Sequence, residues 1–399
     1  MPPPASTRKP RHILYVEGNV DGTVGGSFFS LFYLASRLDR SRYQPLVVFR
    51  TDNPIIPDFR AAGVETRVIP VQPAMTLPTP IGRIAAKAGN FLRGFVLEPR
   101  TLARLLRNER IDLVHLNNSI TRNHVWIVAA RMAGIPCVTH ERGINPQYSG
   151  RSLVLGRGLA AVICISDAVR RNFVARGIRG LKLVTIPNAL DPGEVRVRRN
   201  PGEVREEFGI APQRPLVGMV GNLKHWKGQE VLIRAVATLK SRVPEIACLL
   251  IGDTSRESEA YGRRVRSLIE DLQLQDNVFI TGYRREVGDY INAAQILVHA
   301  SILPEPFGRV LLEAMALRKP LVASNDGAVP EIVSDGVTGL VFRPGDSEHL
   351  AHCLERLLDD PAGARNMGEA GLQRLVERFG IEGNVAATQR LYTKLLGSD

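Results

Sequence analysis

Residues 296–324 have the sequence ILVHASILPEPFGRVLLEAMALRKPLVAS. Two short, mostly apolar runs, Ile296–His299 and Leu321–Ser324, flank a helical pattern over Arg309–Leu317. Near-continuous apolar runs of this length are typical of strands that are buried on both faces of a sheet. Strands that alternate with helical patterns are the sequence form of a parallel α/β sheet. This segment therefore predicts an α/β fold.

The same alternation extends through the chain in both directions. The strands expected in the first half are His12–Val16, Pro45–Phe49, Thr66–Ile69, Asp112–His115, Cys137–His140, Ala161–Ile165 and Lys182–Ile186. The others expected in the second half are Leu216–Val220, Ala247–Ile251, Asn277–Thr281 and Leu340–Phe342. Ligands of doubly wound sheets bind at the carboxyl ends of the strands, so we expect the chemistry in the loops that follow them.

A polar, proline- and charge-rich stretch, Asn188–Pro215, separates the two series. We therefore expect two Rossmann-like, doubly wound domains of similar size that face each other across a cleft. The N-terminal domain is expected over residues 1–192 and the C-terminal domain over residues 193–399. The last segment, Ala364–Leu396, has a helical pattern without a strand. It is expected either to cap the second domain or to cross back to the first.

The composition narrows the possible partners and location. The chain has 399 residues and a formal net charge of +12, which favours anionic partners. Nucleic acid is disfavoured because the basic residues are dispersed and an aromatic stacking motif is missing from the sequence. The four cysteines are far apart and unpaired in sequence, which favours a reducing compartment. Without a signal-like or membrane-spanning apolar run, the sequence predicts a cytoplasmic protein, soluble or peripheral on the membrane.

The region between Ile81 and Arg110 is more basic than the rest of the chain. Its basic residues are Arg83, Lys87, Arg93, Arg100, Arg104, Arg107 and Arg110, and apolar residues are interleaved with them. Basic amphipathic helices of this kind can lie on an anionic membrane surface. The same pattern also fits a solvated helical face above an ordinary core.

Two glycine-containing loops are candidates for binding phosphate groups. The loop Glu17–Gly26 follows the first strand and includes Gly25 and Gly26, but it lacks the GxGxxG pattern of dinucleotide-binding proteins. The loop Gly221–Gly228 follows a strand and contains Asn222 and Lys227. Backbone amides and a lysine in such a loop suit a diphosphate. Tight-turn glycines and an exposed loop lysine are the alternatives.

The most informative residues are two glutamates around a helix start. Glu305 and Glu313 have seven residues between them, and the helix starts at Gly308–Val310. Free amides at a helix start form an anion site. We expect the two carboxylates to accept hydrogen bonds from hydroxyls on either side of a bound phosphate, Glu305 from a sugar and Glu313 from a ribose.

The segment PEPFGRVLLEAMA, with its two glutamates, resembles the EX7E motif of family 4 glycosyltransferases, which have the GT-B fold. The segments GNLKHWKG, VICISDAVRRNF, IPNALD and GAVPEIVSDGVTGLVFRPGD resemble the family as well, and the resemblance covers His12 to Leu358. It implies a retaining glycosyltransferase that uses a nucleotide-sugar donor and neither a metal ion nor another cofactor. Many relatives act in bacterial polysaccharide or glycolipid biosynthesis, with glycan or lipid-linked acceptors.

The resemblance also implies roles for individual residues. Glu305 resembles the contact to the donor sugar, Glu313 the ribose contact and Lys227 the phosphate contact, while Gly25 and Gly26 resemble the N-terminal glycine loop near the phosphates. Phe307, Gly308 and Val310 resemble the segment whose backbone contacts sugar and phosphate. His140 resembles a histidine near the transferred sugar.

The sequence departs from the family pattern at Asn222, where relatives commonly have arginine, and we expect Lys224, Lys227 or Arg309 to compensate. An epimerase or hydrolase acting on sugar nucleotides, and an inactive scaffold with the same fold, remain alternatives to a transferase. The donor sugar, its base and the acceptor are left open.

Overall fold

The computed structural model describes residues 9–19, 26–254 and 258–397 and forms two compact units. The first unit contains the described chain up to Asn188 together with the segment from Ile381 onward, and the second contains Ala189–Gly380. The division falls slightly before the expected boundary after residue 192. The C-terminal helix, for which the sequence left a return to the first domain open, belongs to the first unit.

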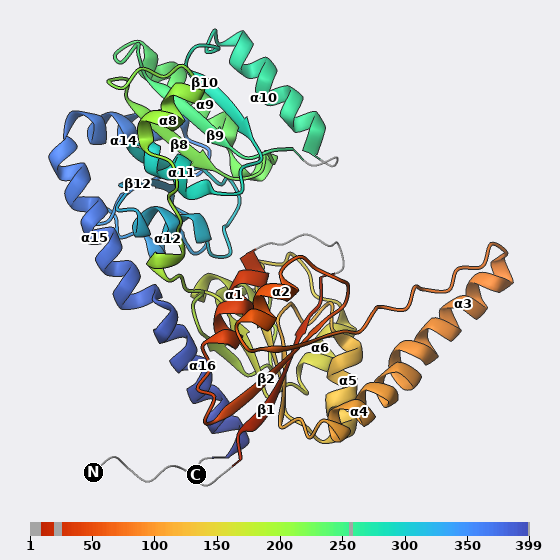
Figure 1. The fold of residues 1–399 in the computed structure, drawn as a ribbon. Coiled ribbons are helices and arrows are strands. Elements are labelled where there is room, and N and C mark those ends of the chain that lie inside the picture. Colours follow the sequence, from red (N-terminus) through yellow and green to blue (C-terminus); the bar gives the residue numbers. More distant parts are fainter. Residues whose placement is uncertain (1–8, 20–25, 255–257, 398–399) are drawn as a thin grey trace, which may run out of the picture. The chain divides into compact units, whose positions relative to one another are not determined.

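The first unit is built on a seven-stranded parallel sheet with the order β3-β2-β1-β4-β5-β6-β7 (Figure 1). Its strands are β1 (Arg11–Glu17), β2 (Tyr43–Phe49), β3 (Glu65–Val68), β4 (Leu113–Leu116), β5 (Cys137–Glu141), β6 (Ala161–Cys164) and β7 (Leu183–Thr185). Its helices are α1 (Gly26–Ser36), α2 (Ile56–Ala61), α3 (Pro80–Leu92), α4 (Glu98–Asn108), α5 (His124–Ala133), α6 (Gly150–Gly156), α7 (Asp167–Ala175) and α16 (Ile381–Leu396). The strand order reverses between β1 and β4, which is where doubly wound sheets bind ligands.

The second unit is built on a six-stranded parallel sheet with the order β10-β9-β8-β11-β12-β13. Its strands are β8 (Leu216–Val220), β9 (Ala247–Ile251), β10 (Val278–Gly282), β11 (Ile296–His299), β12 (Leu321–Ser324) and β13 (Leu340–Phe342). Its helices are α8 (Pro201–Glu207), α9 (Gln229–Lys240), α10 (Glu259–Asp271), α11 (Val287–Ala293), α12 (Arg309–Ala316), α13 (Val329–Ile332), α14 (Ser347–Asp359) and α15 (Pro361–Phe379). Here the switch point lies between β8 and β11.

The strands expected from the sequence are all present, with ends that differ by at most two residues. The apolar runs in the sequence predicted these strands because a strand that is buried on both faces is apolar at most positions. All residues of β4, β9 and β12, for example, are buried. The central strands of both sheets are therefore interior, and a ligand site is expected in the loops at the carboxyl ends of the strands.

Helix α16 completes the core of the first unit. It contacts α1, and the Tyr392 side chain is fully buried. The Tyr392 ring lies against the rings of Tyr43 on β2 and His115 on β4, at centroid distances of 5.7 and 5.8 Å. The sequence left open whether this helix caps the second domain or crosses back. Its burial in the first unit identifies it as the crossing helix.

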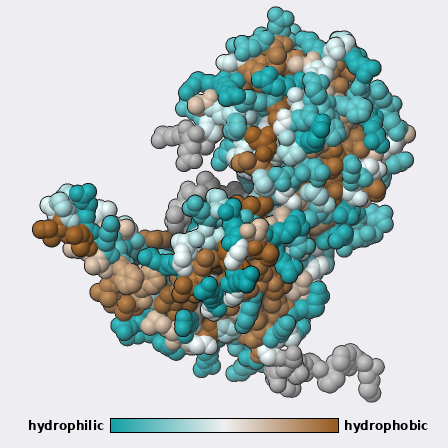
Figure 2. Space-filling model, turned by 180° about the vertical axis from the view of Figure 1, so that it is seen from behind, coloured by the Kyte–Doolittle hydropathy of each residue, from teal (hydrophilic) through white to brown (hydrophobic). Residues whose placement is uncertain are grey.

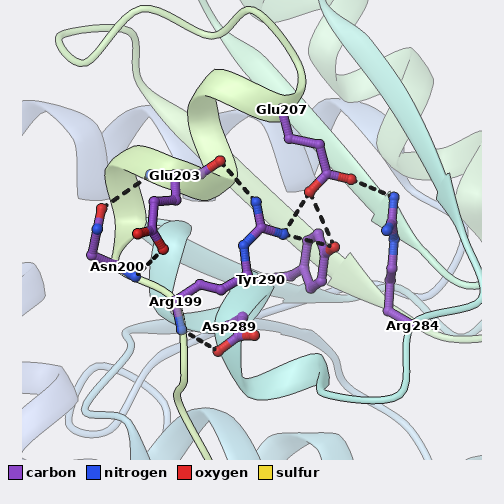
Figure 3. Close-up of polar contacts among 7 residues, drawn as sticks. All are labelled: Arg199, Asn200, Glu203, Glu207, Arg284, Asp289 and Tyr290. Atoms are coloured by element: carbon purple, nitrogen blue, oxygen red, sulfur yellow. Dashed lines mark hydrogen bonds and ion pairs between the residues drawn. The ribbon is translucent and has the colours of Figure 1, made fainter.

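The segment between the two sheets is fixed to the second unit by polar contacts (Figure 3). The backbone amides of Arg198 and Arg199 donate to one carboxylate oxygen of Asp289 on α11, at 2.6 and 3.1 Å. The Arg199 guanidinium pairs with Glu207 on α8 at 2.6 Å. Gly288 is packed so tightly that a Cβ there would lie 2.3 Å from the carbonyl oxygen of Arg196. The connector is therefore ordered against α8 and α11.

Helix α3 extends away from the sheet of the first unit (Figure 1). Of its residues, all of which are described, Ala86 alone is buried. A π-helical turn, Arg93–Leu97, links α3 to α4. Helix α4 buries the side chains of Leu102 and Leu106. The basic segment therefore has an exposed half, α3, and a half that covers the core, α4. Within the described residues, no helix is both long and apolar enough to cross a membrane.

Candidate active site

Two loops approach each other at the carboxyl ends of β8 and β11, the switch point of the second unit. The loop after β8 ends in a 3-10 turn, His225–Lys227, followed by Gly228 with a φ of 78°. A Cβ on Gly228 would lie 2.0 Å from the carbonyl oxygen of Ala300 in the other loop. Only glycine allows this approach, because a side chain would collide with backbone and disfavour the positive φ. The glycine thus places Lys227 beside the loop that follows β11.

Lys227 and Glu305 are in direct contact at this point. Nζ of Lys227 lies 2.8 Å from Oε2 of Glu305, and the two side chains are 19% and 10% exposed. Nζ also lies 4.0 Å from the centre of the Trp226 ring, a cation–π contact that helps to fix the ammonium group. Lys227 and Glu305, which were expected to contact a nucleotide-sugar donor from two separate loops, therefore lie in direct contact with each other.

Two further donors converge on the same oxygen of Glu305. Nε2 of His299 lies 3.1 Å from Oε2, and Oγ of Ser301 donates to it at 3.2 Å. Within the described residues, Oε1 of Glu305 has no hydrogen-bond partner. One oxygen is held in place by three donors, and the other is left to accept a hydrogen bond from a ligand hydroxyl.

This environment keeps Glu305 ionised. Burial alone would raise the pKa of Glu305, but the hydrogen bond from His299 and the charge of Lys227 outweigh it and lower the pKa to about 2. The ionised carboxylate can only accept hydrogen bonds, so we assign the proton of His299 to Nε2. Nδ1 of His299 is buried and unpaired among the described residues, which fits a lone pair there. His299 and Ser301 were not predicted as site residues from the sequence, although both lie just before Glu305.

The loop after β12 supports the backbone of Glu305. The amide of Ala328 donates to the carbonyl oxygen of Glu305 at 2.8 Å. Gly327 has a φ of 62°, and a Cβ there would lie 2.3 Å from the same oxygen. The glycine of the segment GAVPE therefore has a steric role: it lets the two loops pack together.

The remaining site residues of the second unit lie around the start of α12. Gly308 has a φ of 89° and precedes the first helical residue, and Glu313 accepts a hydrogen bond from Nε of Arg309 at 3.0 Å. The Phe307 side chain is buried and contacts Phe379 at a centroid distance of 6.1 Å, so only its backbone is available to a ligand. Val310 is half-buried in the first turn.

The Asn222 side chain is exposed on the loop after β8. Its backbone carbonyl accepts a hydrogen bond from Nε2 of Gln229 at 3.1 Å. Lys224 is half-buried on the same loop. Arg309 is paired with Glu313 and Lys227 with Glu305. Which of Lys224, Lys227 and Arg309 compensates for the arginine of the family pattern stays a prediction.

The first unit contains the other predicted site residues. Gly26 begins α1, and Gly25 lies outside the described residues. His140 is buried near the carboxyl end of β5, and its Nδ1 lies 2.7 Å from Nε2 of His115.

A polar network that the sequence analysis missed lies at the carboxyl ends of β1, β4 and β5. Glu17 ends β1 and accepts a hydrogen bond from the Asn117 side chain at 2.6 Å. Arg142 donates to the carbonyl oxygen and the side-chain oxygen of Asn117 at 2.8 and 2.6 Å. Burial lowers the pKa of Arg142 to about 10 and raises that of Glu141 to about 7. Glu17 and Glu141 end β1 and β5, and Asn117 and Arg142 directly follow β4 and β5. Polar residues at the point where a buried strand ends are the signal that could have found them.

In the part of the chain that the structure describes, no three His, Cys, Asp or Glu side chains are grouped to bind a metal ion.

Comparison with known proteins places both units in glycosyltransferase families. Residues 25–189 match the model of the glycosyl transferase 4-like domain, and residues 202–374 match that of glycosyl transferases group 1. Alpha-maltose-1-phosphate synthase of Mycolicibacterium smegmatis is 30% identical over 324 residues, which cover 71% of this chain and 82% of the relative. The lipopolysaccharide core mannosyltransferase LpcC of Rhizobium leguminosarum is 31% identical over 204 residues, which cover 50% of this chain and 57% of the relative.

A solved structure has the same arrangement of secondary structure. The Anabaena protein HepE in complex with UDP-glucose superposes with a TM-score of 0.76 and 25% identity, covering 96% of this chain and 99% of HepE. Together with the sequence relatives and the two parallel sheets, this likeness shows that the chain is a member of the family 4 glycosyltransferases with the GT-B fold.

Proposed function

We propose that this glycosyltransferase moves a sugar from a nucleoside-diphosphate sugar to a hydroxyl group of a glycan or lipid-linked acceptor, with retention of the anomeric configuration. The observation that carries the proposal is the Lys227–Glu305 group at the switch point of the second domain. It combines a cation for a departing phosphate with a carboxylate oxygen that is free to accept from a sugar hydroxyl.

The proposed chemistry is electrostatic stabilisation of the leaving group. The bond from the anomeric carbon to the diphosphate oxygen breaks, and a bond to the acceptor oxygen forms on the same face of the sugar. The proton of the acceptor hydroxyl passes to the leaving diphosphate oxygen. In this proposal Lys227 and the first-turn amides of α12 stabilise the negative charge that develops on the diphosphate.

Donor binding changes the partners of Lys227. In the structure its ammonium group is paired with Glu305, so an arriving diphosphate must share it. His299 and Ser301 continue to hold Oε2 of Glu305 when the lysine turns toward the phosphate. This second pair of donors keeps the carboxylate in position for the sugar.

Retention is tested with UDP-glucose and no acceptor. Slow transfer to water should release glucose first as the α anomer, which proton NMR detects before mutarotation. Release of the β anomer would contradict retention. A covalent glucosyl adduct on Glu305 or Glu313, found by mass spectrometry, would replace the single-displacement chemistry proposed above.

The donor class is tested by thermal shift with UDP, GDP, ADP, TDP and CMP, each with and without EDTA. UDP is the first candidate because HepE, a structural relative, was solved with UDP-glucose. A ligand at about 100 times its dissociation constant adds about 2.7 kcal/mol of stability, which is measurable. One nucleotide should shift the transition, independently of EDTA, and Lys227→Ala should abolish the shift.

The matched control is Lys240→Ala. This lysine lies at the end of α9 in the same domain, and its ammonium group donates to the carbonyl oxygen of Gln273. The control should keep the nucleotide shift. If wild-type protein shows no shift with any nucleotide, the inactive-scaffold alternative replaces the transferase. Conversion of the sugar nucleotide without an acceptor and at full rate would favour the hydrolase or epimerase.

We further propose that α3 binds an anionic membrane surface and holds a cytoplasmic enzyme at the inner face of the membrane, close to a lipid-linked acceptor. Figure 2 shows hydrophobic residues gathered on the projecting segment. Ile81 and Ile84 are 82% and 70% exposed, and Arg83 and Lys87 are exposed on the same helix. Apolar and basic side chains together suit the boundary between acyl chains and anionic headgroups.

This membrane contact is tested by sedimentation with vesicles of phosphatidylglycerol and phosphatidylcholine. The double variant Ile81→Ser/Ile84→Ser should bind such vesicles at least tenfold more weakly, because it removes about 200 Å² or more of apolar surface from the contact. The control is Val154→Ser/Val174→Ser, which removes two side chains that are 61% and 66% exposed elsewhere in the same domain. Equal vesicle binding by both double variants would exclude α3 as the contact.

A further inference from the structure

A continuous series of four hydrogen-bonded side chains crosses the interior of the first domain, from Tyr15 on β1 through Tyr392 on α16 and His115 on β4 to His140 on β5. Oη of Tyr15 lies 2.9 Å from Oη of Tyr392, Tyr392 is hydrogen-bonded to Nδ1 of His115, and Nε2 of His115 lies 2.7 Å from Nδ1 of His140. All four residues are at most 4% exposed. Such a chain must satisfy every donor internally, since water is excluded from most of it.

The strand register explains why these side chains meet. Tyr15 on β1 is paired with His115 on β4, and His115 is paired with Val138 on β5. His140 lies two residues beyond Val138, so its side chain is on the same face of the sheet. Tyr392 approaches that face from α16.

All four groups are neutral at pH 7. Burial lowers the pKa of His115 to about 3 and lowers that of His140, while it raises the pKa values of Tyr15 and Tyr392. A neutral imidazole has one N–H donor and one acceptor nitrogen, and a phenol has one donor. The hydrogen bonds that link the four side chains can therefore all be donated toward His140 or all be donated toward Tyr15.

The two directions differ at Tyr15. If the protons point from Tyr15 toward His140, the two hydroxyls and the N–H of His115 each have an acceptor among the four side chains, and only the Nε2–H of His140 is left for another acceptor. If they point the other way, the Tyr15 hydroxyl must donate elsewhere, and among the described residues it has no partner other than Tyr392. A buried donor without an acceptor costs about 1–3 kcal/mol, which favours the first direction by roughly fivefold to 150-fold.

Arg40 acts in the same sense. Burial raises the pKa of Tyr15, and the positive charge of the Arg40 guanidinium acts on the Tyr15 hydroxyl in the opposite sense. A cation attracts the lone pairs of a hydroxyl oxygen and repels its hydrogen, so the hydroxyl hydrogen of Tyr15 is expected to point away from Arg40. The Tyr15 proton is thus directed toward Tyr392, and Tyr392 toward Nδ1 of His115.

We propose that Tyr392 and His115 are positioning residues that fix the tautomer of His140, so that its Nε2 carries the proton and donates a hydrogen bond to a substrate oxygen. Nε2 of His140 is the one ring nitrogen of the two histidines without a partner among the described residues, and His140, at 4%, is the one of the four side chains that keeps any exposure. An N–H at this position binds oxygens that can only accept, such as those of a phosphate group, as well as sugar hydroxyls. The substrate contact rests on the proposed function, whereas the tautomer does not.

The test is the tautomer of His140, observed in the full-length protein by long-range proton–nitrogen NMR of labelled histidine. The His140 signals are assigned as those missing from the His140→Gln spectrum. We expect a protonated Nε2 and an unprotonated Nδ1 in the wild type. The reverse assignment would overturn the proposal without involving any substrate.

Three phenylalanine variants separate positioning from packing. Tyr392→Phe removes both the donor to His115 and the acceptor for Tyr15, so the reverse tautomer of His140 should become populated. Tyr15→Phe leaves the Tyr392 hydroxyl with His115 as its acceptor and should keep the wild-type tautomer. Tyr43→Phe is the matched control: Tyr43 also bonds to α16, through Thr393 at 2.9 Å and Gln389 at 3.2 Å, but lies outside the chain. An unchanged tautomer in Tyr392→Phe would exclude Tyr392 as a positioning residue.

Kinetics with UDP-glucose test the substrate contact. If the two tautomers become about equally populated in Tyr392→Phe, KM should rise about twofold, and Tyr43→Phe should match the wild type. A mixed tautomer with an unchanged KM would overturn the contact. If the wild type neither binds nor turns over UDP-glucose, the proposed donor fails, while the NMR result on His140 still decides the tautomer.

Discussion

At the Glu305 carboxylate, acid should remove a stabilising interaction. Its pKa is about 2 in the folded chain against an ordinary value of 4.5, so its contribution is present above pH 4.5 and is lost as the pH falls toward 2. The full difference corresponds to about 3 kcal/mol. Urea unfolding at pH 6 and pH 3 should show that Glu305→Gln is less destabilising at the lower pH. The control, Glu259→Gln, alters a carboxylate that is 67% exposed and should show no such convergence.

Glu141 should respond to pH in the opposite sense. Burial raises its pKa to about 7, so the folded chain binds a proton that the unfolded chain releases above pH 4.5. Its contribution is fully present below pH 4.5 and is lost as the pH rises through 7. The stability of the wild type relative to Glu141→Gln should therefore fall between pH 5 and pH 8. A difference that is constant over this interval would mean that Glu141 is ionised throughout.

At the residue scale, candidate site residues were predictable where a short sequence pattern contains them. The spacing of Glu305 and Glu313 and the lysine of the loop after β8 follow from the sequence alone, and Lys227 and Glu305 are in contact. The convergence of His299 and Ser301 on one oxygen of Glu305 was not predictable, because it depends on rotamers and loop conformation. The roles of these residues in catalysis stay predictions.

At the scale of elements, the packing of α11 against the connector is expected to tolerate no side chain at Gly288. Gly288→Ala would bring Cβ within 2.3 Å of the Arg196 carbonyl oxygen, so the connector must move and the amide hydrogen bonds to Asp289 must lengthen. We expect a loss of about 1–3 kcal/mol in the free energy of unfolding, measured by urea denaturation.

The control for this substitution is Gly383→Ala. Gly383 lies in α16, and a Cβ there would have nothing within 4 Å. Alanine in an open helical position stabilises by about 0.5–1 kcal/mol. If both variants shifted stability in the same direction, steric contact at Gly288 would not be the cause.

The elements themselves were largely predictable from hydrophobic pattern. Strands buried on both faces produce apolar runs that a loop or a surface helix does not, and these runs located both sheets. The basic segment was ambiguous because its pattern does not specify what the apolar face contacts. In the structure α4 buries Leu102 and Leu106, whereas α3 leaves Ile81 and Ile84 exposed. The π-helical turn between them has no simple sequence signal.

At the scale of the whole molecule, each domain has its own core, and we expect two unfolding transitions in calorimetry. Tyr392→Ala should lower the free energy of unfolding of the first domain by about 3–5 kcal/mol, because it leaves a cavity where a fully buried ring was. The first domain should therefore unfold at a lower temperature. UDP should raise the other transition, to which Lys227 and Glu305 belong. Leu232→Ala, a fully buried residue of α9, is the matched variant that should lower only that second transition. A single transition that every change moves would contradict separate cores.

The domain order was predictable, but the exact division was not. The polar connector indicated where one sheet ends and the next begins, since two series of strands flank it. The destination of α16 depends on which buried surface it covers, and its sequence specifies only that one face is apolar. Tyr392 buried beside His115 and Tyr43 settles the assignment to the first domain.

The path of α16 also dictates the order in which the domains are finished during synthesis. Residues 189–380, which form the second domain, leave the ribosome as one uninterrupted stretch. The seven strands of the first domain emerge before them, yet their core lacks Tyr392 until residues 381–396 have been made. The domain that is translated first is therefore completed last. A nascent chain halted after Gly380 holds one finished domain and one with an uncovered apolar face, the kind of surface that chaperones bind.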